Sequence, residues 1–269
     1  MIPRLERSVN YVILGVFAAL VLVPLVNVVV EALGLASAGN RTGGIHLENF
    51  PEAWREARFS TYMANSVLVT VTVLVIAVVV STLAGFALGT MTFRGSGVLF
   101  YLFLLGIMVP AEAIVIPLFF DLRALGLTDT LWGVALPQVA QSTAFGTYWM
   151  RTYFRASNRS IAEAARIDGA GSLRALWSIH LPIARPALVT LVVLLFMWTW
   201  NEFLIPLVMS PTGTMRTVPL GLAFFQGQHT VDHTLMAAAA VMVALPVIGV
   251  YLCAQRHFIR GMLEGAVRE

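Results

Sequence analysis

The chain has 269 residues, of which 58% are hydrophobic and only 12% are charged. Soluble proteins carry about a quarter charged residues, so most of this chain must contact lipid or other apolar helices, and a soluble enzyme is excluded. All 17 basic residues are arginine, and the single cysteine, Cys253, excludes an internal disulfide.

Six apolar runs with few or no charges are long enough to cross a bilayer, because a hydrocarbon core about 30 Å thick needs about 20 helical residues. They cover residues 11–31, 62–92, 97–120, 131–150, 186–209 and 234–255. Runs of helix length do not fit the alternating pattern of barrel strands. The sequence therefore predicts an all-α membrane protein with six transmembrane helices in one domain, 1–269.

The arginines predict the orientation of these helices, since basic residues favour cytoplasmic loops. With the N-terminus inside, twelve arginines fall in inner segments and five in outer ones, so both termini are predicted to be cytoplasmic. Residues 151–185 then form the largest inner loop, and 210–233 form an outer loop. The positive net charge is explained by these arginines in the inner loops, so no nucleic acid is predicted as a partner. A cleaved signal peptide is disfavoured, because signal-peptide apolar regions span only about 7 to 15 residues.

The second and third spans contain residues that predict packing and bending. Ser81, Gly85 and Gly89 recur every four residues, so one face of the second span is small enough for another helix to approach closely. Pro110 and Pro117 predict a bend in the third span, and a fixed kink is favoured over a gating movement.

The inner loop 151–185 contains two short predicted helices. Ser160 and Glu163 have the spacing of a capping box, which begins a helix. Gly169 permits the left-handed conformation that ends such a helix, and Ser172 is placed to cap a second one.

The fixed positions of this loop match a known motif. They are Glu163, Ala164, Ala165, Asp168, Gly169, Ile179, Leu181 and Pro182. The pattern resembles the EAA loop of permease subunits of ABC importers. Further stretches, including 198–203 and 258–267, resemble the second permease subunit of maltose-type, binding-protein-dependent carbohydrate importers.

This resemblance implies a type I ABC importer permease fold in a bacterial cytoplasmic (inner) membrane. It implies a homologous permease partner, two ATPase subunits that bind ATP and magnesium, an extracytoplasmic solute-binding protein, and a carbohydrate as substrate. The chain would form half of the translocation pathway and couple to the ATPases through its EAA loop. The residues of the chain agree with ATP hydrolysis on partner subunits, because they include no phosphate-binding glycine loop followed by lysine. No cofactor is predicted to bind this chain.

The fifth span contains a second candidate site at Trp198, Trp200, Asn201 and Glu202. A sugar presents CH faces that stack on aromatic rings and hydroxyls that need hydrogen bonds, so these four residues are candidates for the translocation path. For Glu202, a structural hydrogen bond between spans and a role in an outer gate are alternative interpretations.

The outer loop contains Gln226, Gly227 and Gln228, which resemble the loop that reaches into the binding protein in maltose-type systems. A solvated connector is the alternative. His229 and His233 have the spacing of metal ligands on one helical face, but no third ligand lies nearby, and no metal site is predicted.

Two other functions compete with ATP-driven import. A proton-coupled secondary transporter would use Glu112 and Glu202 as relay carboxylates. An intramembrane hydrolase would need a serine in a local motif such as G-x-S-x-G, which the chain lacks.

Overall fold

A computed structural model of the protein describes residues 4–35, 44–157, 167–225 and 232–266. Every regular element within these ranges is helical, in agreement with the predicted all-α class. Contacts divide the chain into two compact units, residues 1–61 with 221–246 and residues 62–220 with 247–269.

The first unit contains α1 (Arg4–Ala32), α2 (Asn49–Glu56) and the first part of α13 (His233–Ala266). Two hydrogen bonds hold the end of α1. The Asn49 side-chain amide donates to the Ala32 carbonyl at 2.9 Å, and the Thr234 hydroxyl donates to Glu31 at 3.2 Å.

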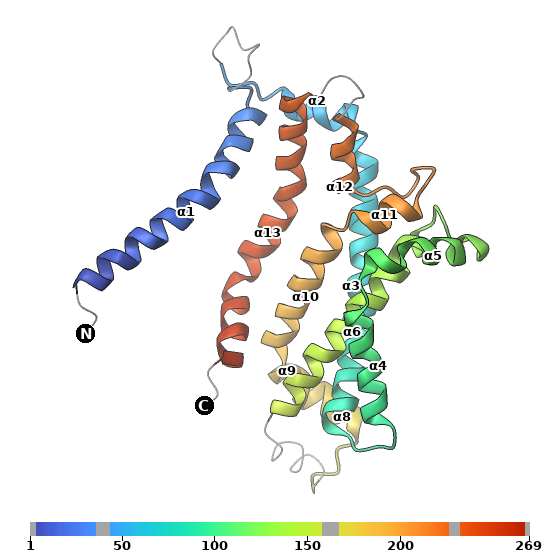
Figure 1. The fold of residues 1–269 in the computed structure, drawn as a ribbon. Coiled ribbons are helices and arrows are strands. Elements are labelled where there is room, and N and C mark those ends of the chain that lie inside the picture. The colour runs from blue at the N-terminus through green and yellow to red at the C-terminus, as the bar shows by residue number, and fades with distance from the viewer. Residues whose placement is uncertain (1–3, 36–43, 158–166, 226–231, 267–269) are drawn as a thin grey trace. The chain divides into compact units, whose positions relative to one another are not determined.

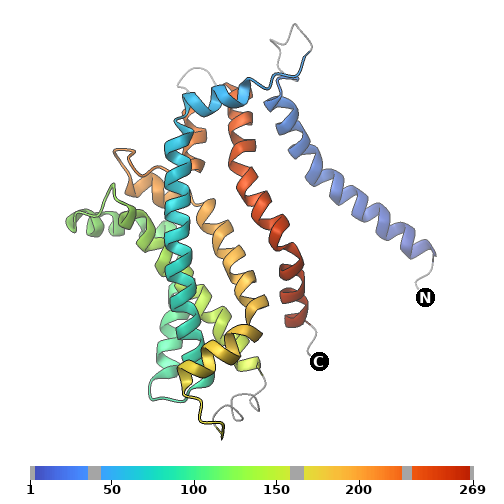
Figure 2. The same cartoon turned by 180° about the vertical axis from the view of Figure 1, so that it is seen from behind.

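The second unit contains most of the helices, which Figures 1 and 2 show from opposite sides. After α3 (Phe59–Thr90), the chain forms α4 (Ser96–Met108), α5 (Ala111–Ala124), α6 (Leu131–Ala156), α8 (Ser172–Ala175), the π-helical turn η1 (Leu176–His180), α9 (Leu181–Ile183), α10 (Arg185–Trp200), α11 (Leu204–Met209), α12 (Val218–Gly221) and the 3-10 turn η2 (Leu222–Phe225). The last glycine of α12 and all of η2 belong to the first unit.

Among the described residues, three helical stretches are long and apolar enough to cross a membrane, at 6–32, 59–90 and 233–255. The pair α4 and α5 also qualifies, bent by 99°. The break falls at Val109, whose backbone is extended because Pro110 follows it. The predicted span 97–120 is therefore two helices, and α5 visibly leaves the direction of α4 (Figure 1).

The predicted span 186–209 is also interrupted, because α10 ends at Trp200 and α11 begins at Leu204. Pro206 explains this difference. In a continuous helix it could not donate a hydrogen bond to the carbonyl of Glu202, and its ring would clash with that carbonyl. A turn at residues 201–203 avoids both costs.

The small-residue face predicted on the second span packs against α6, which confirms that prediction. A Cβ added to Gly85 would lie 2.5 Å from the Cβ of Met150, and one added to Gly89 would lie 3.0 Å from another Cβ of α6. The Ser81 hydroxyl donates to the Thr143 carbonyl at 3.3 Å. Two backbones can approach this closely only where side chains are small.

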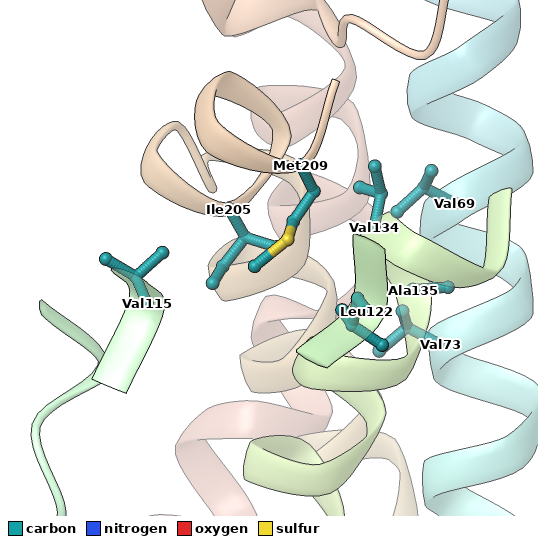
Figure 3. Packing of buried hydrophobic residues seen from close by; sticks show 8 residues of the cluster. All are labelled: Val69, Val73, Val115, Leu122, Val134, Ala135, Ile205 and Met209. Atoms are coloured by element: carbon teal, nitrogen blue, oxygen red, sulfur yellow. The ribbon is translucent and has the colours of Figure 1, made fainter. Parts of the chain in front are cut away.

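Two clusters of buried side chains hold the second unit together. The first joins α3, α5, α6 and α11 and contains Val69, Val73, Val115, Leu122, Val134, Ala135, Ile205 and Met209 (Figure 3). The second joins α3, α6 and α10 to the segment 172–184 and contains Ala77, Phe86, Met150, Phe154, Leu176, Ala184, Leu191 and Leu195. Figure 2 shows that segment, in yellow, at the C-terminal end of α3.

Candidate translocation pocket and coupling segment

A pocket of about 200 Å³ lies beside the break between α10 and α11, within the second unit. Three stretches of chain line it. The end of α4 supplies Gly106, Ile107 and Val109, α6 supplies Gln138, Gln141, Ser142 and Phe145, and the end of α10 with its turn supplies Trp198, Thr199 and Glu202.

Local hydrogen bonds set the position of Glu202. The side-chain amide of Asn201 donates to the Met197 carbonyl at 2.7 Å, which also accepts the Asn201 backbone N–H at 3.3 Å. A carboxylate oxygen of Glu202 then accepts from the Ile205 N–H at 3.0 Å, at the start of α11. Within the described residues this bond is local, so it does not connect Glu202 to another span.

One wall of the pocket is aromatic. The rings of Phe145 and Trp198 meet edge to face, with centroids 4.6 Å apart, and Phe145 also stacks on Trp149. These contacts orient the indole of Trp198, which remains 50% exposed. A ring held in this way can stack against the CH face of a ligand.

Polar side chains on α6 form another part of the pocket wall. Gln138 is only 3% exposed, and its amide nitrogen donates to the Val134 carbonyl at 3.0 Å. Its Oε1 atom has no partner within the described part of the chain. This oxygen is itself fully buried, so it lies behind the surface that Gln138 presents to the pocket.

The four residues predicted for the translocation path are separated by the structure. Trp198 and Glu202 line the pocket. Trp200 is buried and stacks on Phe196, and Asn201 is exposed where it caps α10. The pocket residues on α6 were not predicted. Their signal was that Gln138, Gln141 and Ser142 share one helical face within an otherwise apolar run.

The segment 167–183, which the sequence predicted to lie on the inner side, is the second candidate site. Gly169 has a φ of +72°, which confirms the predicted left-handed turn. The prediction that Ser172 caps the next helix is wrong. Gly171 takes the N-cap position with an extended backbone, and Ser172 is already the first helical residue.

The segment 172–183 has an inward and an outward face. On the inward face, Leu176 and His180 are buried, Ile179 and Leu181 are half-buried, and Leu181 packs on the cluster of Phe86 and its neighbours. The Tyr153 hydroxyl donates to the Ile183 carbonyl at 3.0 Å, which joins the segment to α6.

On the outward face, Leu173 and Trp177 are 68% and 67% exposed, and Asp168 and Pro182 are also exposed. Large apolar side chains gathered on one exposed face indicate a protein contact when that face lies outside the bilayer. The motif residues thus divide between the two faces. The predicted residues Glu163, Ala164, Ala165, Gln226, Gly227, Gln228 and His229 lie outside the described residues.

A group that the sequence analysis missed fixes the loop 210–218. One carboxylate oxygen of Asp129 accepts from the Thr212 N–H at 3.0 Å, the Thr212 hydroxyl at 2.7 Å and the Ser210 hydroxyl at 3.1 Å. Burial raises the pKa of Asp129, but the hydrogen bonds from Thr212, Ser210 and Thr214 outweigh it, and the pKa lies below its ordinary value.

Two residues at the start of α3 also form hydrogen bonds to the loop 210–218. The Asn65 amide donates at 3.0 Å to the carbonyls of both Thr214 and Arg216, and the Ser66 hydroxyl accepts from the Val218 N–H at 2.8 Å. Asp129 itself has a φ of +59°, which only a few residue types adopt readily. No pattern in the sequence pairs Asp129 with a loop some 80 positions later.

We expect Asp129→Ala to loosen this loop and to lower the free energy of unfolding by about 1–2 kcal/mol, because the loop loses its charged acceptor and alanine disfavours a positive φ. Asp129→Asn is the matched control, since it keeps an acceptor oxygen and tolerates this φ. Thermal unfolding and proteolysis within 210–218 measure the effect. Equal behaviour of both variants would contradict this role.

The inward face of the segment 172–183 should respond to pH. The His180 ring lies 5.1 Å from Phe86 and 6.0 Å from Phe154, between centroids, and burial lowers its pKa. Its neutral form is therefore favoured in the fold. The stability it contributes is complete above its unfolded pKa of about 6.5, and it is lost as pH falls below that value towards the folded pKa.

Protection of the 172–184 amides against hydrogen exchange, measured relative to their intrinsic rates at each pH, should accordingly fall at acid pH in the wild-type chain. His180→Phe keeps an aromatic ring without a titrating nitrogen, so this loss of protection should disappear in that variant. The same pH dependence in both chains would show that His180 is not its cause.

Three apolar helical stretches of membrane length, together with the bent pair α4 and α5, indicate a multi-pass membrane protein. Residues 81–264 match the model of the family described as binding-protein-dependent transport system inner membrane component. The chain belongs to this family, whose members are transport permeases.

Several relatives agree with this assignment. The probable ABC transporter permease protein YurM of Bacillus subtilis is 34% identical over 83% of this chain and 74% of its own length. The diacetylchitobiose uptake system permease protein NgcG of Streptomyces coelicolor is 28% identical over 98% of this chain and 90% of its own. The trehalose transport system permease protein SugB of Mycobacterium tuberculosis is 32% identical over 83% and 82%, respectively.

A solved structure shares the fold. It is a chain from a bacterial ABC transporter involved in the import of the acidic polysaccharide alginate. That chain matches with a TM-score of 0.79 and 26% identity, over 96% of this chain and 99% of its own.

Proposed function

We propose that the chain is a permease subunit of an ATP-driven importer for a sugar or sugar derivative, and that the pocket beside the α10–α11 break is part of its translocation path. The lining of this pocket is the observation that supports the proposal. It combines the exposed ring of Trp198 with the carboxylate of Glu202 and the polar side chains of Gln141 and Ser142. Stacking surface beside hydrogen-bonding groups is what a carbohydrate requires. The names of relatives that transport diacetylchitobiose and trehalose support the same substrate class.

The energy for transport would enter through the segment 167–183. ATP and magnesium would bind to two partner ATPase subunits, and the outward face with Leu173 and Trp177 would dock on one of them. Two exposed apolar side chains beside the motif residues Asp168 and Gly169 support this assignment. Aromatic side chains such as Trp177 are enriched among the residues that dominate binding energy at interfaces.

The remaining assembly completes the proposal. The chain would cross the inner membrane six times with both termini in the cytoplasm, and the bent and interrupted helices would each count as one crossing. A homologous permease subunit would supply the other half of the path. A solute-binding protein would deliver the sugar from outside, with Gln226, Gly227 and Gln228 in contact with it.

The test is sugar uptake per assembled complex in two variants of Glu202. Glu202→Gln keeps an acceptor for the Ile205 N–H, so it should preserve assembly while weakening uptake or changing sugar preference. Glu202→Ala loses that bond and should also reduce the amount of complex. Wild-type uptake in both variants would remove Glu202 from the path.

A matched control separates ATP-driven import from proton coupling. Glu112→Gln removes another acidic side chain, one that does not line the pocket. An ATP-driven importer should retain uptake in this variant and lose it without the ATPase subunits. Uptake that persists without those subunits and collapses with the proton gradient would indicate a secondary transporter instead.

A further inference from the structure

We infer that this pocket selects neutral or cationic sugars and rejects acidic ones, an inference that rests on the proposed role in sugar import. Among the described residues that line the pocket, Glu202 is the only ionisable one. The sugar would therefore meet one fixed carboxylate and no basic side chain from the described part of this chain.

The arginines of the lining helices lie outside the pocket. Arg151 on α6 is six residues beyond Phe145, about 9 Å along the helix axis. Its guanidinium is 3.5 Å from the centroid of the Phe100 ring, and its Nε donates to the Leu88 carbonyl at 3.3 Å. It is thus engaged elsewhere. The chain contains no lysine that could take its place.

The carboxylate of Glu202 cannot easily turn away from a ligand, because one of its oxygens holds the Ile205 N–H. Within the described residues, the other oxygen has no partner. A sugar hydroxyl that donated to it would form a charge-assisted hydrogen bond, and the ammonium group of an amino sugar would form an ion pair.

The exposed face of the Trp198 ring also disfavours an anion, because it attracts CH groups and cations. Gln141 and Ser142 can donate or accept, so they suit hydroxyls of any sugar. A uronate or sugar phosphate would bring a second negative charge to Glu202 with no cation to pair with it, and at partial burial this repulsion is poorly screened.

This conclusion sets the chain apart from its structural relative, which comes from a transporter for an acidic polysaccharide. Similar folds can serve opposite cargo charges, because the residues that line the site decide the chemistry.

The test measures sugar binding to the complete complex, with its partner permease and ATPase subunits, in lipid nanodiscs. Three disaccharide probes of one length differ in charge: neutral diacetylchitobiose, protonated chitobiose and a diuronate. We expect the wild type to bind the neutral and cationic probes at least about tenfold more tightly than the diuronate. Glu202→Gln should narrow that ratio to about threefold or less and should weaken binding of protonated chitobiose.

A second variant keeps Glu202 and its hydrogen bond. Gln141→Arg adds a cation to the pocket wall and should favour the diuronate. Asp121→Asn on α5 is the control, since it removes an acidic charge outside the lining residues and should leave the ratio unchanged.

Binding without discrimination by charge in the wild type, or a ratio that neither variant moves, would overturn this inference alone. If no sugar probe of any charge binds or is taken up, then both the inference and the proposed function are wrong.

Discussion

Replacing Gly169 by aspartate is expected to abolish sugar-stimulated ATP hydrolysis by the complex while leaving the chain in the membrane. The φ of +72° places this residue in the left-handed region, which aspartate and asparagine both adopt at a modest cost. Nothing lies within 4 Å of an added Cβ, so the variant should not disturb packing inside the chain. The added carboxylate would instead have to lose its water at the contact with the ATPase.

Gly169→Asn is the matched control, because asparagine tolerates this conformation and adds no charge. We expect it to retain most of the coupling. ATP hydrolysis and copurification of the ATPase subunits measure the two variants. Normal sugar-stimulated hydrolysis in Gly169→Asp would contradict the proposed coupling role.

Replacing Gly85 by valine is expected to destabilise the fold most, by about 3 kcal/mol. The first added carbon would already lie 2.5 Å from the Met150 Cβ and 2.8 Å from the Arg151 backbone nitrogen. Neither neighbour is the end of a flexible side chain, so α3 and α6 would have to separate. That movement would open the buried cluster that contains Met150.

Gly97→Val provides the comparison, since a Cβ at Gly97 meets nothing within 4 Å and this glycine also lies in a helix. Thermal unfolding of the two purified variants in the same detergent should show a large loss for Gly85 and little change for Gly97. Equal unfolding temperatures would show that α3 and α6 do not depend on this close contact.

The sequence predicted these helix contacts well where the signal is local. The four-residue repeat from Ser81 identified the face of α3, and the left-handed turn followed from Gly169. The break at Pro110 was expected as a kink, but its 99° angle depends on how α5 packs on α3 and α11. The break after Trp200 was missed, although Pro206 and the polar pair Asn201 and Glu202 were its signals.

The pocket could be predicted only in part. An ionisable residue within an apolar run drew attention to Glu202, because such a residue is expensive in a membrane. Gln138 reaches the same pocket from a helix some 60 positions earlier, and that proximity arises from the packing of α6 against α10. Asp129 was missed for the same reason, since its hydrogen bonds join two loops that no periodicity connects.

The buried cluster around Phe86, Met150 and Leu191 has a mechanical consequence. It packs the segment 172–184 against the first two-thirds of α10, while Trp198 and Glu202 line the pocket at its C-terminal end and just beyond it. With 16 residues, α10 is about 24 Å long, so it can act as a lever between the two sites. If the pocket end stayed in place, a displacement of about 4 Å at the coupling end would tilt this helix by about 10°. A tilt of that size would change the width of the pocket without any change in secondary structure.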